Sequence, residues 1–314
     1  MPAAWDPIDH VLALDPGGRG IARFFQPGAA RRGARALVGA RRALIVTGFS
    51  VPPGLPETDG PPGAAVLGRA LRLCGVAVRY VTDPGVTPIL AAALRALREP
   101  ADVEAYPDGP DAARDVLLRE RPTHLLAIER PGRSRSGDYL SARGESLAAW
   151  NRPLDDLFLL AHRERSRSHF ASHSGHPRLK PTSRTPLQRR AGLAVPVTVT
   201  VGDGGNEIGM GNVRARLARE GRLTARIASV VRADHLVVAG VSNWGAYGIV
   251  AALGLLRKRA LLHTVEDERR LVEACVEAGA VDGITRRREP TVDGLPLDAH
   301  TAVVELLRLV SSPP

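Results

Sequence analysis

VPVTVTVGDGGNEIGMGNV (residues 195–213) is the stretch of sequence that decides the fold of this chain. Its β-branched first part is typical of a buried strand. Five glycines follow among the twelve residues Gly202–Val213. Because glycine costs conformational entropy, so many of them indicate a backbone shaped closely around a small molecule. The stretch predicts a strand ending in a ligand-binding loop, with Asp203, Asn206 and Glu207 facing the ligand beside the amides of Gly204 and Gly205.

The same loop has a plainer interpretation, a glycine-rich turn in which Asp203 or Asn206 caps a helix. A helix cap needs only one such polar side chain, so capping does not account for both Asn206 and Glu207. The glycines at 202, 204, 205, 209 and 211 do not match the dinucleotide-binding spacing, and no Lys-Ser/Thr pair ends the loop as in a P-loop. The pattern favours a small ligand over a nucleotide.

Short β-branched runs alternate with Ala/Leu-rich stretches from residue 41 onward, a pattern that builds a parallel sheet covered by helices. The sequence predicts an α/β domain over 41–314 with a mostly parallel, doubly wound, Rossmann-like sheet and helices on both faces. Expected strands are 43–47, 76–82, 103–105, 124–129, 197–201 and 235–239. Expected helices are 63–74, 88–97, 111–120, 153–163, 244–257, 266–278 and 298–309.

Two segments lie outside this alternation. Residues 1–40 are expected to form an N-terminal arm with a short helix near Gly20. Residues 163–192 are rich in Ser, Arg, His and Pro and lack a periodic apolar face, so they are expected to be a basic, mobile insertion.

The net charge of +10 does not predict a nucleic-acid partner. Eight basic residues and one acid fall between 163 and 190, so one segment supplies most of the charge, and aromatic residues make up only 4%. The longest apolar run, Ala246–Leu256, is about half of what a bilayer requires. The first ten residues, MPAAWDPIDH, have neither a basic nor an apolar region, so no secretory signal is expected. We therefore expect neither a membrane nor a nucleic-acid partner. We expect a cytoplasmic location.

Polar residues follow the ends of several expected strands. In open α/β sheets, ligands bind outside the carboxyl ends of the strands, so these residues are expected to share one rim. Besides the glycine loop they are Glu57, Asp59, Glu129, Arg130, Arg133, Arg143, Ser242 and Asn243. Because arginines bind carboxylates and acids bind ammonium groups, the rim suits a small molecule that carries both.

Each member of the rim also has a purely structural interpretation. Glu57 and Asp59 could lie in a solvated Pro/Gly turn. Glu129-Arg130 could be an ion pair at a strand end, and Ser242-Asn243 could cap the next helix. Asp293, in a late Val-Asp-Gly turn, could equally be a turn residue or a site residue.

Eight segments occur in the same order as in a known family. They are PETDGPPG (56–63), IERPGRS (128–134), RGE (143–145), PLDDLF (153–158), the glycine loop, AGVSNWGAYG (239–248), AGAVDGIT (278–285) and TVDGLPL (291–297). From about residue 47 to 309 the chain resembles the C-terminal domain of D-glutamate cyclases. The resemblance implies a lyase that converts D-glutamate to 5-oxo-D-proline and water.

In long eukaryotic relatives this domain follows a hydro-lyase-like domain, which leaves open which half carries the chemistry. The alternative is a non-catalytic amino-acid-binding module of a two-domain cyclase.

The implied cyclisation needs a base for the α-amine, an acid for the departing oxygen and a tight mould for the substrate. Asp203 or Glu207 is the expected base, Glu129 the expected acid, and Arg130 or Arg143 the expected partner of the α-carboxylate. The other expected substrate-binding residues are Glu57, Asp59, Arg133, Gly204, Gly205, Asn206, Ser242 and Asn243.

The reaction requires no cofactor, but Mg²⁺ is an alternative explanation of the acids. Glu57, Asp59, Asp203 and Glu207 could supply its oxygen ligands in an enzyme acting on another small carboxylate. Whether the chain forms a homo-oligomer stays open.

Overall fold

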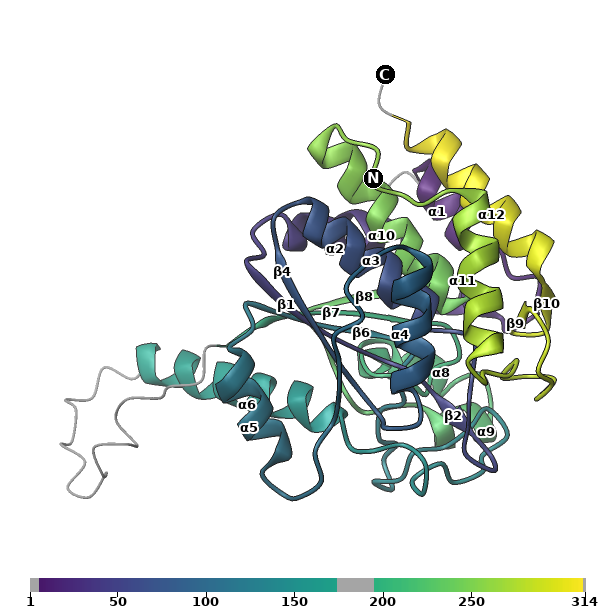
Figure 1. The fold of residues 1–314 in the computed structure, drawn as a ribbon. Coiled ribbons are helices and arrows are strands. Elements are labelled where there is room, and N and C mark those ends of the chain that lie inside the picture. The colour runs from purple at the N-terminus through teal and green to yellow at the C-terminus, as the bar shows by residue number, and fades with distance from the viewer. Residues whose placement is uncertain (1–5, 174–194, 313–314) are drawn as a thin grey trace.

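The computed structural model describes residues 6–173 and 195–312 (Figure 1). A six-stranded parallel sheet forms its centre, in the order β5-β4-β1-β6-β7-β8. The strands are β1 (Arg42–Thr47), β4 (Ala77–Thr82), β5 (Val103–Ala105), β6 (His124–Ile128), β7 (Val197–Gly202) and β8 (His235–Val238). The chain builds outward from β1 to β5, then returns to place β6 on the other side of β1. The switch point of this doubly wound sheet therefore lies between β1 and β6, and the predicted α/β fold is confirmed.

Helices cover both faces of the sheet (Figure 1). One face carries α2 (Ala29–Leu37), α3 (Pro61–Leu73), α4 (Thr87–Ala96) and α10 (Ser242–Arg257), with α1 (Pro7–Leu12), α11 (Val265–Glu277) and α12 (Leu297–Val310) packed outside them. The opposite face carries α5 (Ala112–Glu120) and α6 (Asp155–His173). Short elements complete the carboxyl edge: β2 (Ser50–Val51), β3 (Leu55–Pro56), β9 (Thr291–Val292), β10 (Leu295–Pro296), η1 (Ile21–Arg23), η2 (Met210–Asn212), α8 (Arg214–Leu217) and α9 (Arg222–Ile227).

The side chains of β1 alternate between two hydrophobic cores, one on each face of the sheet. Ala43 and Ile45 belong to the large core beneath α3 and α10, whereas Leu44 and Val46 belong to the smaller core beneath α5 and α6. Successive side chains of a strand point to opposite faces, so a strand covered on both sides is apolar throughout. This is why the sequence shows continuous apolar runs and no polar alternation.

The segment expected as an N-terminal arm packs into the large core. Ile8 and Leu12 of α1 are each 1% exposed, and α2 contacts α10 and β8. The Asp9 carboxylate accepts a hydrogen bond from the Gly28 amide at 2.8 Å, which joins α1 to the start of α2. These contacts hold the loop between α1 and α2 against the sheet. The short helix expected near Gly20 is η1.

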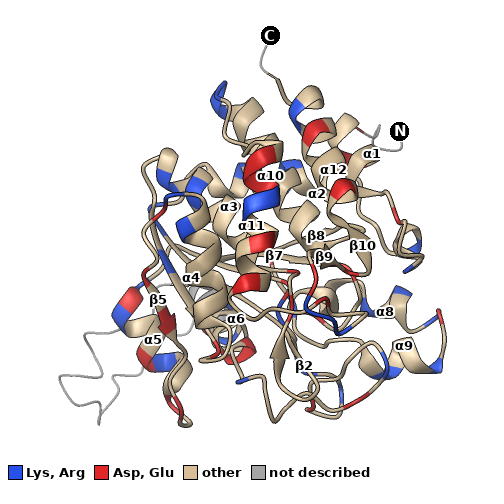
Figure 2. Cartoon of the chain, turned by 45° about the vertical axis from the view of Figure 1, so that its right-hand side comes forward, with Lys and Arg blue, Asp and Glu red and all other residues tan. Residues whose placement is uncertain are grey.

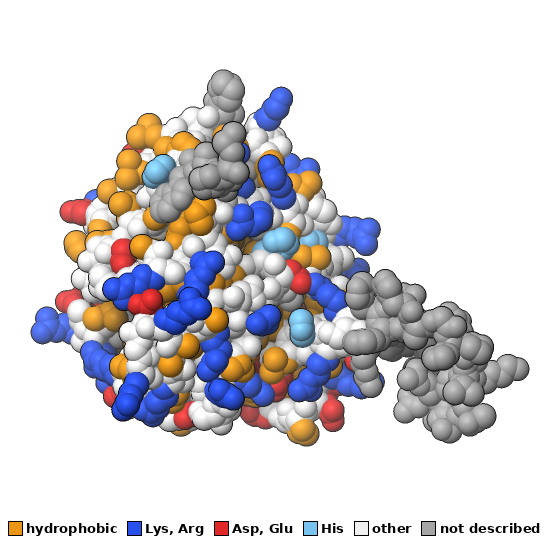
Figure 3. All heavy atoms as spheres, turned by 180° about the vertical axis from the view of Figure 1, so that it is seen from behind, with side chains coloured by type: hydrophobic (Ala, Val, Ile, Leu, Met, Phe, Trp, Pro, Cys, Tyr) orange, Lys and Arg blue, Asp and Glu red, His pale blue; other side chains and the backbone are white. Residues whose placement is uncertain are grey.

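The basic segment expected as a mobile insertion over 163–192 begins within a helix. Residues 163–173 form the second half of α6, and residues 174–194 lie outside the described residues. No helix in the described part of the chain is both long and apolar enough to cross a membrane. On the face seen in Figure 3, Lys and Arg side chains are interspersed with hydrophobic and uncharged surface.

The packing of α1 generates a stability prediction. Leu12→Ala is expected to lower the free energy of unfolding by about 2–5 kcal/mol, because it opens a cavity against α10. Leu14→Ala is the matched control, since Leu14 is 43% exposed, and it should cost less than about 0.5 kcal/mol. Urea denaturation measures both. Equal, small losses would show that α1 does not belong to the folded core.

Candidate active site

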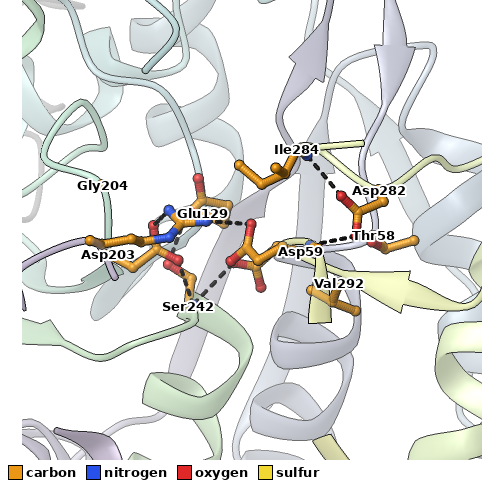
Figure 4. A network of polar contacts seen from close by, with 12 residues as sticks. Thr58, Asp59, Glu129, Asp203, Gly204, Ser242, Asp282, Ile284 and Val292 are labelled. Atoms are coloured by element: carbon orange, nitrogen blue, oxygen red, sulfur yellow. Dashed lines mark hydrogen bonds and ion pairs between the residues drawn. The ribbon is translucent and has the colours of Figure 1, made fainter. Parts of the chain in front are cut away.

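The N-terminus of α10 binds two carboxylates that come from different strands. The Ser242 amide donates to Asp59 Oδ2 and to Asp203 Oδ2, both at 3.0 Å, and the Asn243 amide donates to Asp59 Oδ1 at 2.8 Å. Free amides and the helix dipole make such an end favourable for negative charge. Ser242 does not cap the helix with its side chain, since the N-cap residue is Val241. Its hydroxyl donates instead to Glu129 Oε2 at 2.6 Å, which brings a third acid to the same point (Figure 4).

Asn243 fixes the start of α3 beside these acids. Its Oδ1 accepts hydrogen bonds from the Gly60 amide at 3.0 Å and the Gly63 amide at 2.7 Å. Gly60 has a φ of 101°, and a Cβ there would lie 2.8 Å from Thr47 Oγ1 and 3.0 Å from Glu129 Cβ. Only glycine allows this approach. The adjoining Asp59 is thereby held between the two helix termini.

Glu129 stands at the switch point of the sheet, directly after β6. Its φ of 41° is uncommon for a residue with a side chain. The backbone on either side holds it there: its amide donates to the Val201 carbonyl at 3.3 Å, and its carbonyl accepts from the Gly48 amide at 3.1 Å. The residue is 6% exposed. Backbone conformations of this kind concentrate at functional sites because the surrounding structure must enforce them.

Arg19 supplies the positive charge of the site. It lies in the loop between α1 and η1, where the Asp15 carboxylate accepts hydrogen bonds from the amides of Arg19 at 2.8 Å and Gly20 at 2.7 Å. The guanidinium forms ion pairs with Asp203 and with Asp293, the latter at 2.5 Å. The sequence interpretation missed Arg19. The signal that could have found it is its glycine-rich surroundings, PGGRG, in a segment otherwise interpreted as an arm.

Asp293 is presented by the turn of the β9–β10 hairpin. The turn is held by Asp282, whose Oδ2 accepts from the Gly294 amide at 2.7 Å, and by the Thr58 hydroxyl, which donates to the Thr291 carbonyl at 2.7 Å. Among the described residues, the buried Asp293 Oδ2 has no hydrogen-bond partner. The residue therefore belongs to the site and offers one free acceptor to a ligand.

The glycine loop is shaped by one of its own acids. Glu207 Oε1 accepts from the amides of Asp203 at 3.2 Å and Gly204 at 2.6 Å, and Oε2 accepts from the Gly205 amide at 2.8 Å. Asn206 Nδ2 donates to the Leu140 carbonyl at 2.7 Å. These amides are occupied by Glu207, so in this structure they do not face an open ligand position. Glu207 and Asn206 therefore stabilise the conformation of the loop.

A small cleft of about 70 Å³, partly open to solvent, lies beside these residues, and Glu57, Glu129 and Asp293 line it. Arg143 and Arg286 lie at its mouth, and Arg286 pairs with Glu145 at 2.8 Å. Glu57 reaches into it across Gly283, where a Cβ would lie 2.0 Å from Glu57 Oε2. The Glu57 carboxylate is on a residue only 7% exposed, and no hydrogen bond or ion pair of that carboxylate occurs within the described residues.

We call five carboxylates at this point the acid cluster. They are Glu57, Asp59, Glu129, Asp203 and Asp293. Figure 2 shows acidic and basic positions meeting in the loops near β9, and Figure 4 shows Asp59, Glu129 and Asp203 converging above Ser242. One guanidinium, that of Arg19, pairs with two of the five acids. Because unpaired charges are costly to bury, the cluster must take up protons or a further cation.

The pKa values of the cluster reflect this shortage of positive charge. Burial, followed by the charge of Asp293, raises the pKa of Glu57 well above its usual range and that of Asp59 to about 8. Burial and the charge of Glu207 raise the pKa of Glu129. Burial also raises the pKa of Asp203, although Arg19 opposes the shift. Burial lowers the pKa of Arg19, but the carboxylates of Asp203 and Asp293 more than offset this and raise it above its usual range.

The structure brings most of the expected site residues together and places two elsewhere. Arg130 is fully buried and pairs with Asp83, so it holds the loops after β1 and β4 and does not line the cleft. Arg133 pairs with Asp155 at 2.7 Å, at the start of α6. The ion pair between Glu129 and Arg130, the structural alternative for these two residues, does not form, and Glu129 is left without a cationic partner among the described residues.

The sequence profile described as D-glutamate cyclase-like, C-terminal, matches residues 8–171 and 187–308. The chain belongs to this family. It is 33% identical over 267 residues to a human protein named D-glutamate cyclase, mitochondrial. The match spans 79% of this chain and 38% of that protein. The cytoplasmic location expected for the present chain stays a prediction.

Two solved structures align weakly with this chain. An exopolyphosphatase-related protein from Bacteroides fragilis aligns with a TM-score of 0.40 and 8% identity over 89% of this chain and 56% of that chain. RecJ from Thermus thermophilus aligns with a TM-score of 0.35 and 10% identity over 97% of this chain and 39% of that chain. Likenesses this low carry no functional argument.

The raised pKa of Asp59 predicts a pH dependence of stability. The folded protein keeps a proton that the unfolded chain, with a pKa of 3.8, loses at lower pH. The free energy of unfolding should therefore fall as pH rises from about 4 to about 8, by at most about 1.4 kcal/mol per pH unit for one proton. Asp59→Asn should reduce this slope in urea denaturation. Asp102→Asn, at a side chain 65% exposed, should not; equal slopes in both variants would contradict the assignment.

Proposed function

We propose that the protein converts D-glutamate to 5-oxo-D-proline and water. The observation that carries this proposal is the acid cluster at the carboxyl edge of the sheet, in a chain that belongs to the D-glutamate cyclase-like family. The cluster holds more negative than positive charge, because one guanidinium, that of Arg19, pairs with two of its five acids. The cleft beside it has arginines at its mouth. A molecule with an ammonium group and carboxylates complements both features.

Substrate orientation follows from this distribution of charge. The α-ammonium enters the acid cluster, where Glu57 and Asp293 have free acceptors. The α-carboxylate faces Arg143 and Arg286 at the mouth. This arrangement folds the amine toward the γ-carboxyl carbon, and positioning of two groups within one molecule can supply about 7–11 kcal/mol of the barrier.

Asp203 and Glu129 divide the proton transfers between them. We assign the base to Asp203, because the charge of Arg19 opposes the burial that raises the pKa of Asp203, and in this role Asp203 accepts a proton from the ammonium group. Glu129 has no cationic partner in the described part of the chain and its pKa is raised by burial, so it stays protonated and donates to the departing γ-oxygen. The amine nitrogen bonds to the γ-carbon, and the two protons that it loses leave with that oxygen as water. Ser242, bonded to Glu129, orients the acid.

This division predicts the turnover of two variants. Asp203→Asn and Glu129→Gln should each lower kcat for D-glutamate by about 10²–10⁴-fold, the usual contribution of a general acid or base. Release of 5-oxoproline, separated by chromatography, is the measurement, with D- and L-glutamate compared. Asp102→Asn is the matched control and should turn over like the wild type. Unchanged turnover in Asp203→Asn would remove it from the mechanism.

The same experiment decides between an enzyme and a binding module. A non-catalytic module would bind D-glutamate or 5-oxoproline saturably in a calorimetric titration and release no product. Binding without turnover by the wild-type chain would overturn the catalytic proposal and favour the module.

A divalent cation is the second candidate, favoured by one specific observation. Asp59, Glu129 and Asp203 each offer a carboxylate oxygen, and these oxygens lie within 4.8 Å of one another. Such oxygens suit Mg²⁺ or Mn²⁺, which would polarise a carboxylate of the substrate in an enzyme acting on glutamate or another small carboxylate. Glu207, which the sequence offered as a ligand, already binds three backbone amides.

Titration with Mn²⁺, followed by electron paramagnetic resonance, tests this candidate. One bound ion per chain is expected, with affinity lowered at least about tenfold in Glu129→Gln and unchanged in Asp102→Asn. Absence of a bound ion in the wild type, with turnover unaffected by a chelator, would exclude a metal requirement.

A further inference from the structure

The cleft beside the acid cluster adjoins a second, larger hollow. This second hollow has a volume of about 340 Å³, is partly open to solvent, and is lined by Phe24, Thr224 and Ile227 among others. The two hollows share Arg19, Ala142, Gly204, Ile284 and Asp293. These residues, among them the small Gly204 and Ala142, form a common wall, so the two hollows lie side by side.

Free glutamate is too small to use this space. Its ammonium and α-carboxylate are matched by the acid cluster and the mouth of the first cleft, as proposed above. The second hollow would then contribute nothing to its binding. It is also of different character, because apolar Phe24 and Ile227 lie beside the exposed Arg23–Glu220 ion pair. Apolar surface with a few polar groups suits an organic substituent.

Charge gives an independent indication of what that substituent replaces. The γ-carbonyl must lie near Glu129 for the proposed chemistry, on the acidic side of the cleft. Glu57, Asp59, Asp203 and Asp293 surround this side, and Arg19 is already paired with two of them. A free γ-carboxylate adds another negative charge there, whereas a γ-amide is neutral. The amide carbonyl is also the better electrophile, since it carries no charge that repels the nucleophile.

We propose that the site also acts on γ-glutamyl amides, with the glutamyl unit in the first cleft and the amine substituent in the second hollow. This inference rests on the proposed function, whose base and acid it uses. The α-nitrogen, deprotonated by Asp203, forms a bond with the γ-carbonyl carbon. The carbon–nitrogen bond of the amide then breaks, its electron pair stays on the leaving nitrogen, and Glu129 protonates that nitrogen. The attacking nitrogen gives its second proton to the Glu129 carboxylate that this donation leaves, so the products are 5-oxoproline and a free amine.

The experiment compares two substrates with the whole chain of 314 residues. γ-D-Glutamyl-p-nitroanilide releases coloured p-nitroaniline, and D-glutamate releases 5-oxoproline only. Thr224→Trp fills the second hollow without touching the first cleft, and Thr224→Ser is its matched control. The wild type is expected to turn over the anilide with a kcat/KM at least about tenfold above that for D-glutamate. Thr224→Trp should lower kcat/KM for the anilide at least about tenfold and leave D-glutamate within about twofold.

The outcomes separate this inference from the proposed function. Turnover of D-glutamate without release of p-nitroaniline overturns the inference and leaves the cyclase. Anilide turnover that Thr224→Trp does not change overturns the assignment of the second hollow. Failure of both substrates in a chain whose circular dichroism shows a folded α/β protein overturns the proposed function, and the inference with it.

Discussion

Two backbone amides at the start of α10 organise this protein. They bind the carboxylates of Asp59 and Asp203, which come from the loops after β1 and β7. The adjoining side chains extend the same junction, because Ser242 reaches Glu129 after β6 and Asn243 binds two amides at the start of α3. The N-terminus of a helix favours negative charge, and here it brings acids from the loops after three strands to one point. The cleft, its charge and its chemistry all follow from that junction.

The junction concentrates more negative charge than the protein neutralises. Five carboxylates gather around Arg19, which pairs with two. Structures retain such an imbalance at a cost in stability, and the cost is recovered when a cation or protons bind. The imbalance raises the pKa values of these acids, and both the proposed ammonium-bearing substrate and the alternative proposal of a divalent cation rest on it.

Other arginines near the edge of the sheet serve the framework. Arg130 joins Asp83 to the loop after β1, and Arg133 joins the loop after β6 to α6. Their pairs are satisfied within the protein, so they keep the walls of the cleft in place. Glu57, Glu129 and Asp293 differ because each keeps an oxygen without a partner among the described residues or faces the cleft directly. The charged residues at this edge therefore fall into two groups: arginines that pair within the framework, and acids that face the cleft.

The sequence by itself determined the fold class, the six strands of the sheet and the strand-end loops that meet at its edge, because apolar periodicity and glycine-rich loops are local properties. It also named Asp59, Glu129 and Asp203. It could not decide that Arg130 is buried against Asp83, that Glu207 binds its own loop, or that Arg19 and Asp293, from opposite ends of the chain, complete the cluster. Only the tertiary structure decided these, because an ion pair depends on distance in space, and residues separated by most of the chain meet only after the sheet and its helices have packed.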